Sequence, residues 1–289
     1  MDYSQFMIMH HEIGLLIVFL LVFLFDTFLP KNAQSKLSVT ACVLFGAYTL
    51  YGFFAPITFG SAFTGMYETT PIVASIKNIL NVGVFLVLLQ SIKWNNSESQ
   101  LVRRGEFIEL MLLTLFGMYL MVSARHFLLF IIGLETASLP LAALVAFDKK
   151  QYESHEAAVK YIFTAVFSSA IYMMGLSFVY GLTGSLYFHD IAGRVLAYEN
   201  SALLIVALAF VIAGIGFKIS LVPFHLWTAD VYQGAPTSVT SYLSVISKGA
   251  ASFAALVILT QVFGTVYSQV WEWMLYALII LTITIGNLF

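Results

Sequence analysis

The chain is dominated by apolar stretches that are long enough to cross a membrane. A spanning helix needs about 20 mostly apolar residues, because lipid offers no hydrogen-bond partners to an open backbone. Nine stretches meet this requirement: 12–29, 37–57, 75–92, 107–124, 126–147, 156–181, 201–228, 237–263 and 269–289. The third stretch is the weakest candidate. Lys77 lies near the beginning of this stretch and is expected at the membrane interface. The sequence therefore predicts an all-α polytopic membrane protein with about nine transmembrane helices.

Composition excludes the other broad classes of protein. Hydrophobic residues make up 60% of the chain and charged residues 10%, so a water-soluble fold could not cover its apolar side chains. A net charge of −2 offers no basic surface to nucleic acid. The single cysteine, Cys42, excludes an internal disulfide, and the sequence contains neither a metal-ligand spacing nor a Gly-rich phosphate loop. We therefore expect no metal and no cofactor in this chain.

Lysine and arginine in the loops predict the orientation, because inner loops of membrane proteins are enriched in both. If the N-terminus lies outside, the outer loops carry two such residues, Arg125 and Arg194. The inner loops then carry seven: Lys31, Lys36, Lys93, Arg103, Arg104, Lys149 and Lys150. This asymmetry favours an outside N-terminus.

Two polar connectors divide the chain. The loop 93–106, KWNNSESQLVRRGE, is the most polar stretch and separates a three-helix segment, 1–92, from the helices that follow. The connector 182–200 contains His189, Asp190 and Arg194 and is expected to lie flat at the outer surface. The last apolar run has no polar tail, and this favours a piece of a longer protein.

Two ionisable residues lie deep inside predicted spans. Insertion scales give a free-energy cost of roughly 2.5–3.5 kcal/mol for a charged side chain that faces lipid at a helix centre. The presence of each such residue therefore calls for a structural or functional explanation. Glu135 lies near the middle of its span, and Lys218 has at least ten residues on either side. Pro223 removes a backbone donor, so we expect the seventh helix to be discontinuous here, as helices are at transporter binding sites. The alternative for both charges is a structural role.

Three further residues are candidates for the same site. His225 follows Lys218 by seven residues, and its ordinary pKa suits a proton relay, although a buried histidine is often only a hydrogen-bonding group. Lys248 lies about eleven residues into its helix. Lys160 lies only four residues into its span with Glu156 at i−4, so a surface ion pair explains it equally well.

Three strings carry a resemblance to a known family: GLETASLPLAALVAF, HEAAVKYIFTAVFSSAIYMMGLSFVYGLTGS and GFKISLVPFHLWTADVYQGAPTSVTSYLSVISKGA. They resemble the antiporter-like membrane subunits of bacterial NADH-quinone oxidoreductase, respiratory complex I, and among these most closely subunit N. The resemblance is strong over about 135 to 250. Ala229 stands where the family usually has Pro, and Thr136 where it has a larger apolar residue.

The resemblance implies a proton-translocating subunit of this oxidoreductase. It implies a first five-helix antiporter-like unit over 107–263 and the start of a truncated second unit at 264–289. The residues that would carry protons are Glu135, Lys160, Lys218, His225 and Lys248, with Glu135 and Lys218 acting as a pair. The partners implied are the other membrane-arm subunits and the lipid bilayer, with NADH and quinone bound elsewhere in the complex. The location implied is the bacterial inner membrane, with a periplasmic N-terminus.

Three other functions stay open. A multisubunit cation/proton antiporter of the sodium type resembles this family closely, and so does a membrane-bound hydrogenase of the same descent. The third is a structural membrane subunit without transport, in which the buried charges could be replaced by Leu or Gln without loss.

Overall fold

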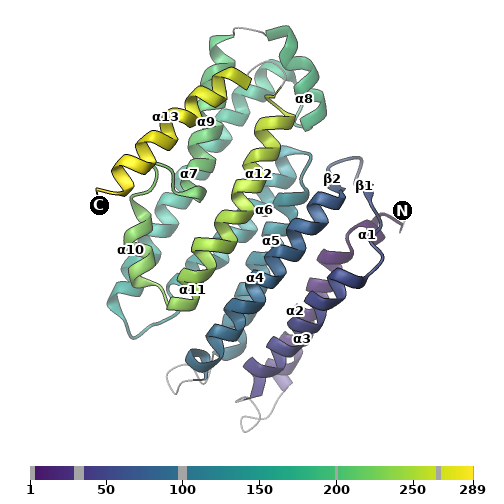
Figure 1. Cartoon of the computed structure of the whole chain (residues 1–289), viewed down its shortest axis with the longest axis vertical. Coiled ribbons are helices and arrows are strands. Elements are labelled where there is room, and N and C mark those ends of the chain that lie inside the picture. The colour runs from purple at the N-terminus through teal and green to yellow at the C-terminus, as the bar shows by residue number, and fades with distance from the viewer. Residues whose placement is uncertain (1–3, 29–35, 97–102, 199–200, 265–267, 289) are drawn as a thin grey trace.

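Helices dominate the computed structural model, which describes residues 4–28, 36–96, 103–198, 201–264 and 268–288 (Figure 1). The helices are α1 (Ser4–Ile8), α2 (His10–Phe28), α3 (Leu37–Phe54), α4 (Pro71–Asn95), α5 (Arg104–Ser123), α6 (Phe127–Val145), α7 (Tyr152–Thr183), α8 (Phe188–Val195), α9 (Ala202–Ile219), α10 (Trp227–Gly234), α11 (Thr237–Ser241), α12 (Lys248–Gln261) and α13 (Ser268–Gly286). A π-helical stretch, Tyr242–Ser247, joins α11 to α12 in a single span. Within the described ranges, nine helices are long and apolar enough to cross a membrane, which confirms the predicted all-α polytopic class.

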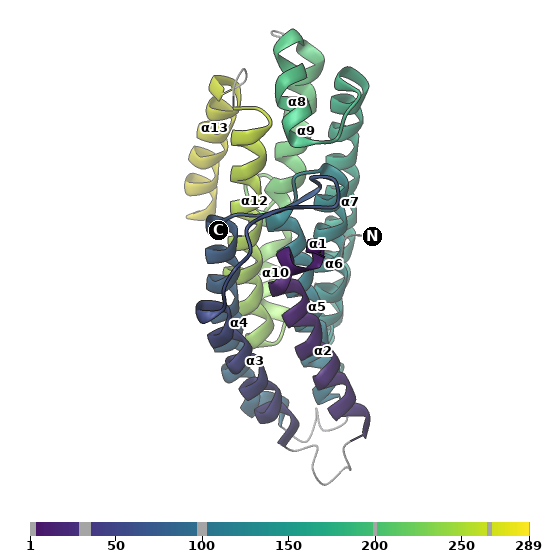
Figure 2. The same ribbon diagram turned by 90° about the vertical axis from the view of Figure 1, so that its right-hand side faces the viewer.

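The spans form one bundle with a continuous core. Figures 1 and 2 place α2 and α3 at one edge and α13 at the opposite edge. The span α5 is the most buried of the nine, and α13 is the least. One cluster of buried apolar side chains includes residues from Leu15 in α2 to Phe263 beyond α12. The helices before and after the loop predicted at 93–106 therefore share a single core. Of that loop, residues 97–102 lie outside the described residues, as does Lys31.

A short β-hairpin, which the sequence did not predict, covers the start of α4. Strand β1 (Gly60–Ala62) pairs antiparallel with β2 (Tyr67–Thr69). The strands are three residues long, and the turn places Phe63 and Thr64 at positive φ, +53° and +56°, where Asn and Gly would be expected. The sequence of this segment therefore lacks the features from which a hairpin could be predicted.

Two isolated β-bridges bring several connections together at one end of the bundle. Tyr67 of β2 pairs with Ala124, and His126 pairs with Tyr187 before α8. The buried residues of α8 are Phe188, Ile191 and Val195, which share one face of a short helix. The hairpin, the α5–α6 turn and α8 thus lie toward the same end, and Trp94 at the far end of α4 marks the other (Figure 1).

The seventh span is discontinuous, as predicted. Helix α9 ends at Ile219, and α10 begins at Trp227 and continues toward the end of the bundle away from the hairpin (Figure 1). Gly214 brings α9 against α7, since a Cβ there would lie 2.5 Å from the Cβ of Tyr172. The Ser168 hydroxyl of α7 also donates to the carbonyl oxygen of Gly214 at 2.7 Å. Gly214 is therefore a point of close contact between α7 and α9.

Helices α5 and α6 cross backbone to backbone. A Cβ on Gly117 would lie 2.4 Å from the amide nitrogen of Ala137, and a Cβ on Gly133 would lie 2.6 Å from that of Met121. Small residues allow such an approach between membrane helices. This crossing fixes the position of α6, and with it the position of Glu135.

Gly117→Ala is expected to lower the thermal stability of the purified protein in detergent. The new methyl group meets backbone atoms that cannot move aside, and such overpacking costs about 1–3 kcal/mol. Gly181→Ala in α7 is the matched control, because a Cβ there meets nothing within 4 Å and alanine favours a helix by up to about 1 kcal/mol. Unfolding midpoints measured by a thermal-shift assay should fall for the first variant and hold or rise for the second. Equal midpoints would contradict the close crossing.

Candidate functional site

Lys218 is a buried lysine in the last turn of α9. Its side chain is 5% exposed, and its Nζ donates to the Ser138 hydroxyl at 2.7 Å and to the Tyr161 hydroxyl at 3.3 Å. The ammonium also lies 6.0 Å from the centre of the Tyr161 ring, within cation–π range. The negative end of a helix dipole favours a cation in the last turn. Two hydroxyls, one ring and a helix end therefore hold this charge.

Glu135 belongs to the same cluster without touching the lysine directly. It lies on α6 one turn before Ser138, so the two residues share a face of that helix. Its Oε1 is buried, and none of the described residues gives it a hydrogen-bond partner. Ser138 accepts from Lys218 and donates to the Leu134 carbonyl oxygen at 2.6 Å. Glu135 therefore lies one helical turn from the serine that binds Lys218, and no salt bridge joins the two charges among the described residues.

The break between α9 and α10 satisfies its backbone inside the protein. Ser220 takes a left-handed conformation, with φ +65°, and Pro223 follows. The backbone N–H of Val222 donates to the Thr282 hydroxyl of α13 at 3.1 Å. The Trp227 indole donates to the Phe217 carbonyl oxygen at 3.2 Å. Irregular backbone at membrane depth is tolerated only where protein or water satisfies it, and these contacts do so.

A cavity of about 560 Å³ beside the break brings His225 and Lys248 together. Its other polar lining residues are Ser220, Thr228 and Thr282. Three buried polar atoms on this lining find no partner among the described residues, namely Ser220 Oγ, His225 Nδ1 and Thr228 Oγ1. Buried polar atoms of this kind usually bind water. The cavity is therefore suited to a few water molecules between the histidine and the lysine.

Lys160 lies apart from this cluster, at the edge of the bundle. Its side chain is 42% exposed, and its Nζ lies 2.7 Å from Glu156 and 2.6 Å from Asp230. The ion pair with Glu156 is the one that its i, i+4 spacing predicted. The pair with Asp230, which ties α7 to α10, was missed because 70 residues separate the two in sequence.

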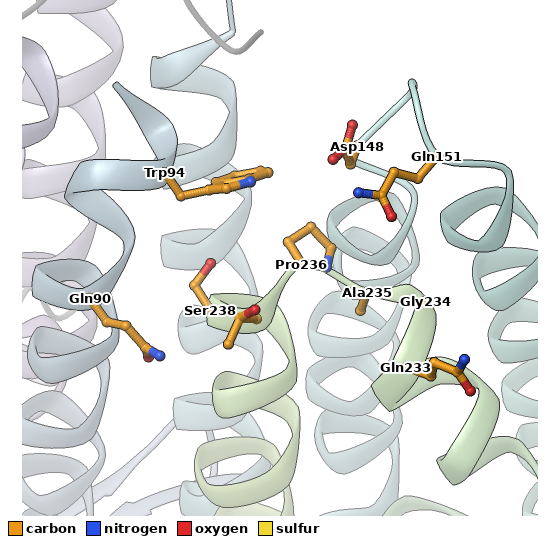
Figure 3. A pocket seen from close by; sticks show the side chains of 10 residues that line it. Gln90, Trp94, Asp148, Gln151, Gln233, Gly234, Ala235, Pro236 and Ser238 are labelled. Carbon is orange, nitrogen blue, oxygen red and sulfur yellow. The ribbon is translucent and has the colours of Figure 1, made fainter. Parts of the chain in front are cut away.

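A polar cavity opens beside the last turns of α4. It measures about 380 Å³, and Gln90 and Trp94 of α4 face Asp148 and Gln151 across it (Figure 3). A smaller cavity next to Lys160 shares Gln233 and Gly234 with it. Polar lining thus continues from the last turns of α4 to the Lys160–Asp230 pair.

Lys77, which we expected to meet water at the membrane interface, is enclosed by protein. Its side chain is fully buried, and its Nζ lies 2.6 Å from Glu12 Oε1 and 2.9 Å from the Tyr67 hydroxyl. The hairpin explains the difference, because strand β2 contributes Tyr67 and covers the helix end where the lysine was expected to meet water. Burial of this lysine could not be read from a sequence that did not reveal the hairpin.

Known proteins resemble this chain in sequence and in fold. A family model described as "NADH:quinone oxidoreductase/Mrp antiporter, TM" matches residues 124–289. NADH-quinone oxidoreductase subunit N of Azobacteroides pseudotrichonymphae genomovar. CFP2 is 49% identical over the whole chain, and that of Phocaeicola vulgatus is 48% identical. The chain spans 60% of the length of each relative.

A solved structure of a respiratory complex also contains a chain that is similar to this one. Respiratory complex I from Thermus thermophilus with bound Aureothin contains a chain that matches 96% of this one, with a TM-score of 0.73 and 29% identity. The match covers 57% of that chain. The protein described above therefore belongs to the NADH:quinone oxidoreductase/Mrp antiporter family of transmembrane proteins.

Proposed function

We propose that the chain is a proton-translocating part of subunit N in the membrane arm of NADH-quinone oxidoreductase. The observation that carries the proposal is Lys218, a buried ammonium held by two neutral hydroxyls at the end of a broken helix. The chain would act as part of a translocase, and the redox chemistry that drives it would lie in other subunits. NADH and quinone would bind there as well, and this chain would hold no cofactor.

The chemistry follows from how Lys218 is solvated. Hydroxyl groups stabilise an ammonium less than a carboxylate in direct contact does. Because both hydrogen-bond partners of Lys218 are hydroxyls, loss of the Lys218 proton leaves no anion in direct contact with the amine. Glu135, one turn from Ser138, changes the electrostatic cost of that loss when its own charge changes or its side chain moves. Moving one charge through 100 mV takes about 2.3 kcal/mol, which is less than two pKa units at about 1.36 kcal/mol each. Environmental shifts of buried groups are large enough for this.

The proposed route runs sideways from the broken helix. A proton leaving Lys218 would cross water in the cavity beside the break, pass His225 and reach Lys248, since both side chains line that cavity. Lys160 is assigned to the uptake side, because it lies at the exposed end of the polar cavities with Asp230. The division into a five-helix unit over 107–263 and a second unit from 264 is part of the same proposal.

The second candidate is a subunit of a multisubunit cation/proton antiporter. The observation that supports this alternative is the description of the matching family model, which names Mrp antiporters together with NADH:quinone oxidoreductase. Transport that depends on sodium in membrane vesicles would support it, whereas transport that depends on NADH and quinone would support the oxidoreductase.

Lys218→Ala and Glu135→Ala are expected to lower proton pumping by at least about tenfold in vesicles that carry the assembled complex, because each removes a positioned proton-transfer group. Lys218→Arg should also fail, since arginine keeps the charge but cannot release its proton. Lys150→Ala, at an exposed loop position, is the control and should pump normally. Proton uptake into inverted vesicles during NADH oxidation is the measurement. Normal pumping by both alanine variants would point to a structural role.

The proposed location is the bacterial inner membrane, with the hairpin end and the N-terminus on the periplasmic side. Cysteine labelling can test this orientation, because the native Cys42 is buried and His189 in α8 is fully exposed. An impermeant maleimide should label His189→Cys in right-side-out vesicles. It should label Lys150→Cys only after the membrane is permeabilised. The reverse pattern would overturn the assigned orientation.

A further inference from the structure

A second ionic cluster lies buried outside the proposed route. Lys77 of α4 donates to Glu12 of α2 at 2.6 Å and to the Tyr67 hydroxyl at 2.9 Å. Tyr67 in turn donates to the other carboxylate oxygen of Glu12 at 2.7 Å, and Thr69 donates to Tyr67 at 3.1 Å. The side chains of the pair are 0% and 1% exposed. Burying two charges costs several kcal/mol per ion before their attraction is counted, so an apolar pair of similar size would often serve stability as well.

A chain of hydroxyl and amide groups leads from this cluster toward the centre of the bundle. The Tyr48 hydroxyl donates to the carbonyl oxygen of His11, next to Glu12, and lies 3.2 Å from the Tyr119 hydroxyl. Tyr119, on the central helix α5, donates to the amide oxygen of Asn81. Asn81 lies one turn from Lys77 on α4, and the Lys77 ammonium lies 5.5 Å from the centre of the Tyr119 ring. The ion pair therefore lies beside a network of hydrogen-bonded polar side chains.

Unpartnered polar atoms surround this network. His11 Nδ1, Asn81 Nδ2 and Ser123 Oγ are buried and find no partner among the described residues, and their side chains are at most 1% exposed. The ring centre of His10 lies 4.1 Å from that of His11, and both ring nitrogens of His10 are also buried without a partner among the described residues. Because buried groups of this kind usually bind water, the network is suited to internal water. An ion pair that only fastened the hairpin would need no such groups.

We propose that Glu12 and Lys77 form a second proton-binding site, in the three-helix segment that precedes the antiporter-like unit. The proposal rests on the proposed function, because it assumes that the assembled protein moves protons. Lys77 Nζ passes a proton to Glu12 Oε1 across 2.6 Å: an N–H bond breaks, an O–H bond forms, and both groups become neutral. The Glu12 carboxyl then gives this proton to water, and the Lys77 amine takes another from a water on the side of Asn81 and Tyr119.

The hairpin gives the site a direction. Tyr67 and Thr69 of β2 lie over the ion pair at the end of the bundle assigned to the periplasm, whereas Tyr119 and Asn81 lead toward the core. A proton accepted from the core side would therefore leave toward the hairpin. This would give the N-terminal segment an outlet that does not involve the Lys218 axis.

The test is Lys77→Arg in the assembled complex, measured as protons pumped per electron in vesicles during NADH oxidation. Arginine can keep the ion pair with Glu12, so a structural role survives the change, but it cannot release its proton. We expect normal assembly and electron transfer with a lower proton-to-electron ratio. Lys93→Arg, at an exposed position on the same helix, is the matched control and should change nothing.

A normal ratio in Lys77→Arg would overturn the second site and leave a structural ion pair. If that variant fails to assemble, Glu12→Gln serves instead, because it keeps the shape and one acceptor oxygen but cannot take up the proton; a normal ratio there overturns the proposal equally. Lys218→Ala is measured in parallel. Lost pumping in Lys218→Ala with a normal ratio in Lys77→Arg rejects only the second site, whereas normal pumping in both rejects the proposed function itself.

Discussion

The solvation of one ammonium group at membrane depth organises the centre of this protein. Lys218 cannot face lipid at an acceptable cost, so three helices supply what water would otherwise provide. Helix α6 contributes the Ser138 hydroxyl, α7 contributes Tyr161, and α9 contributes its own negative end. The last contribution requires α9 to stop inside the membrane, which is why the broken helix and the buried lysine belong together.

Ending a helix in the membrane has its own consequences. Backbone groups freed at the break need partners, and Val222 finds one on Thr282 of α13. Polar side chains that find none gather around the neighbouring cavity, where His225 and Lys248 also lie. The crossing of α5 and α6 at Gly117 and Gly133 holds α6, which carries Ser138 and Glu135. The bundle thus encloses several polar groups beside the break, which the proposed proton path requires.

Local features of the sequence were enough to predict much of this arrangement. Span positions follow from hydropathy, the break follows from Pro223, and the depth of Lys218 follows from counting residues. Helical spacing from Glu135 would also have identified Ser138. Contacts between distant segments were not predictable: Asp230 meets Lys160 across 70 residues, and the hairpin that buries Lys77 consists of two three-residue strands without a typical turn. The sequence located the buried Lys218 beside the break, but not the buried ion pair that the hairpin covers.

The central claim is that Lys218 exchanges between ammonium and amine while the protein works. Solid-state NMR of the complex with ¹⁵N-labelled lysine side chains can observe this directly, with Lys218→Arg used to assign the resonance by its disappearance. The account predicts an Nζ signal that moves between the ammonium and amine positions when the resting complex is compared with the complex under turnover. A signal that stays at the ammonium position in both states, while proton pumping continues, would contradict it.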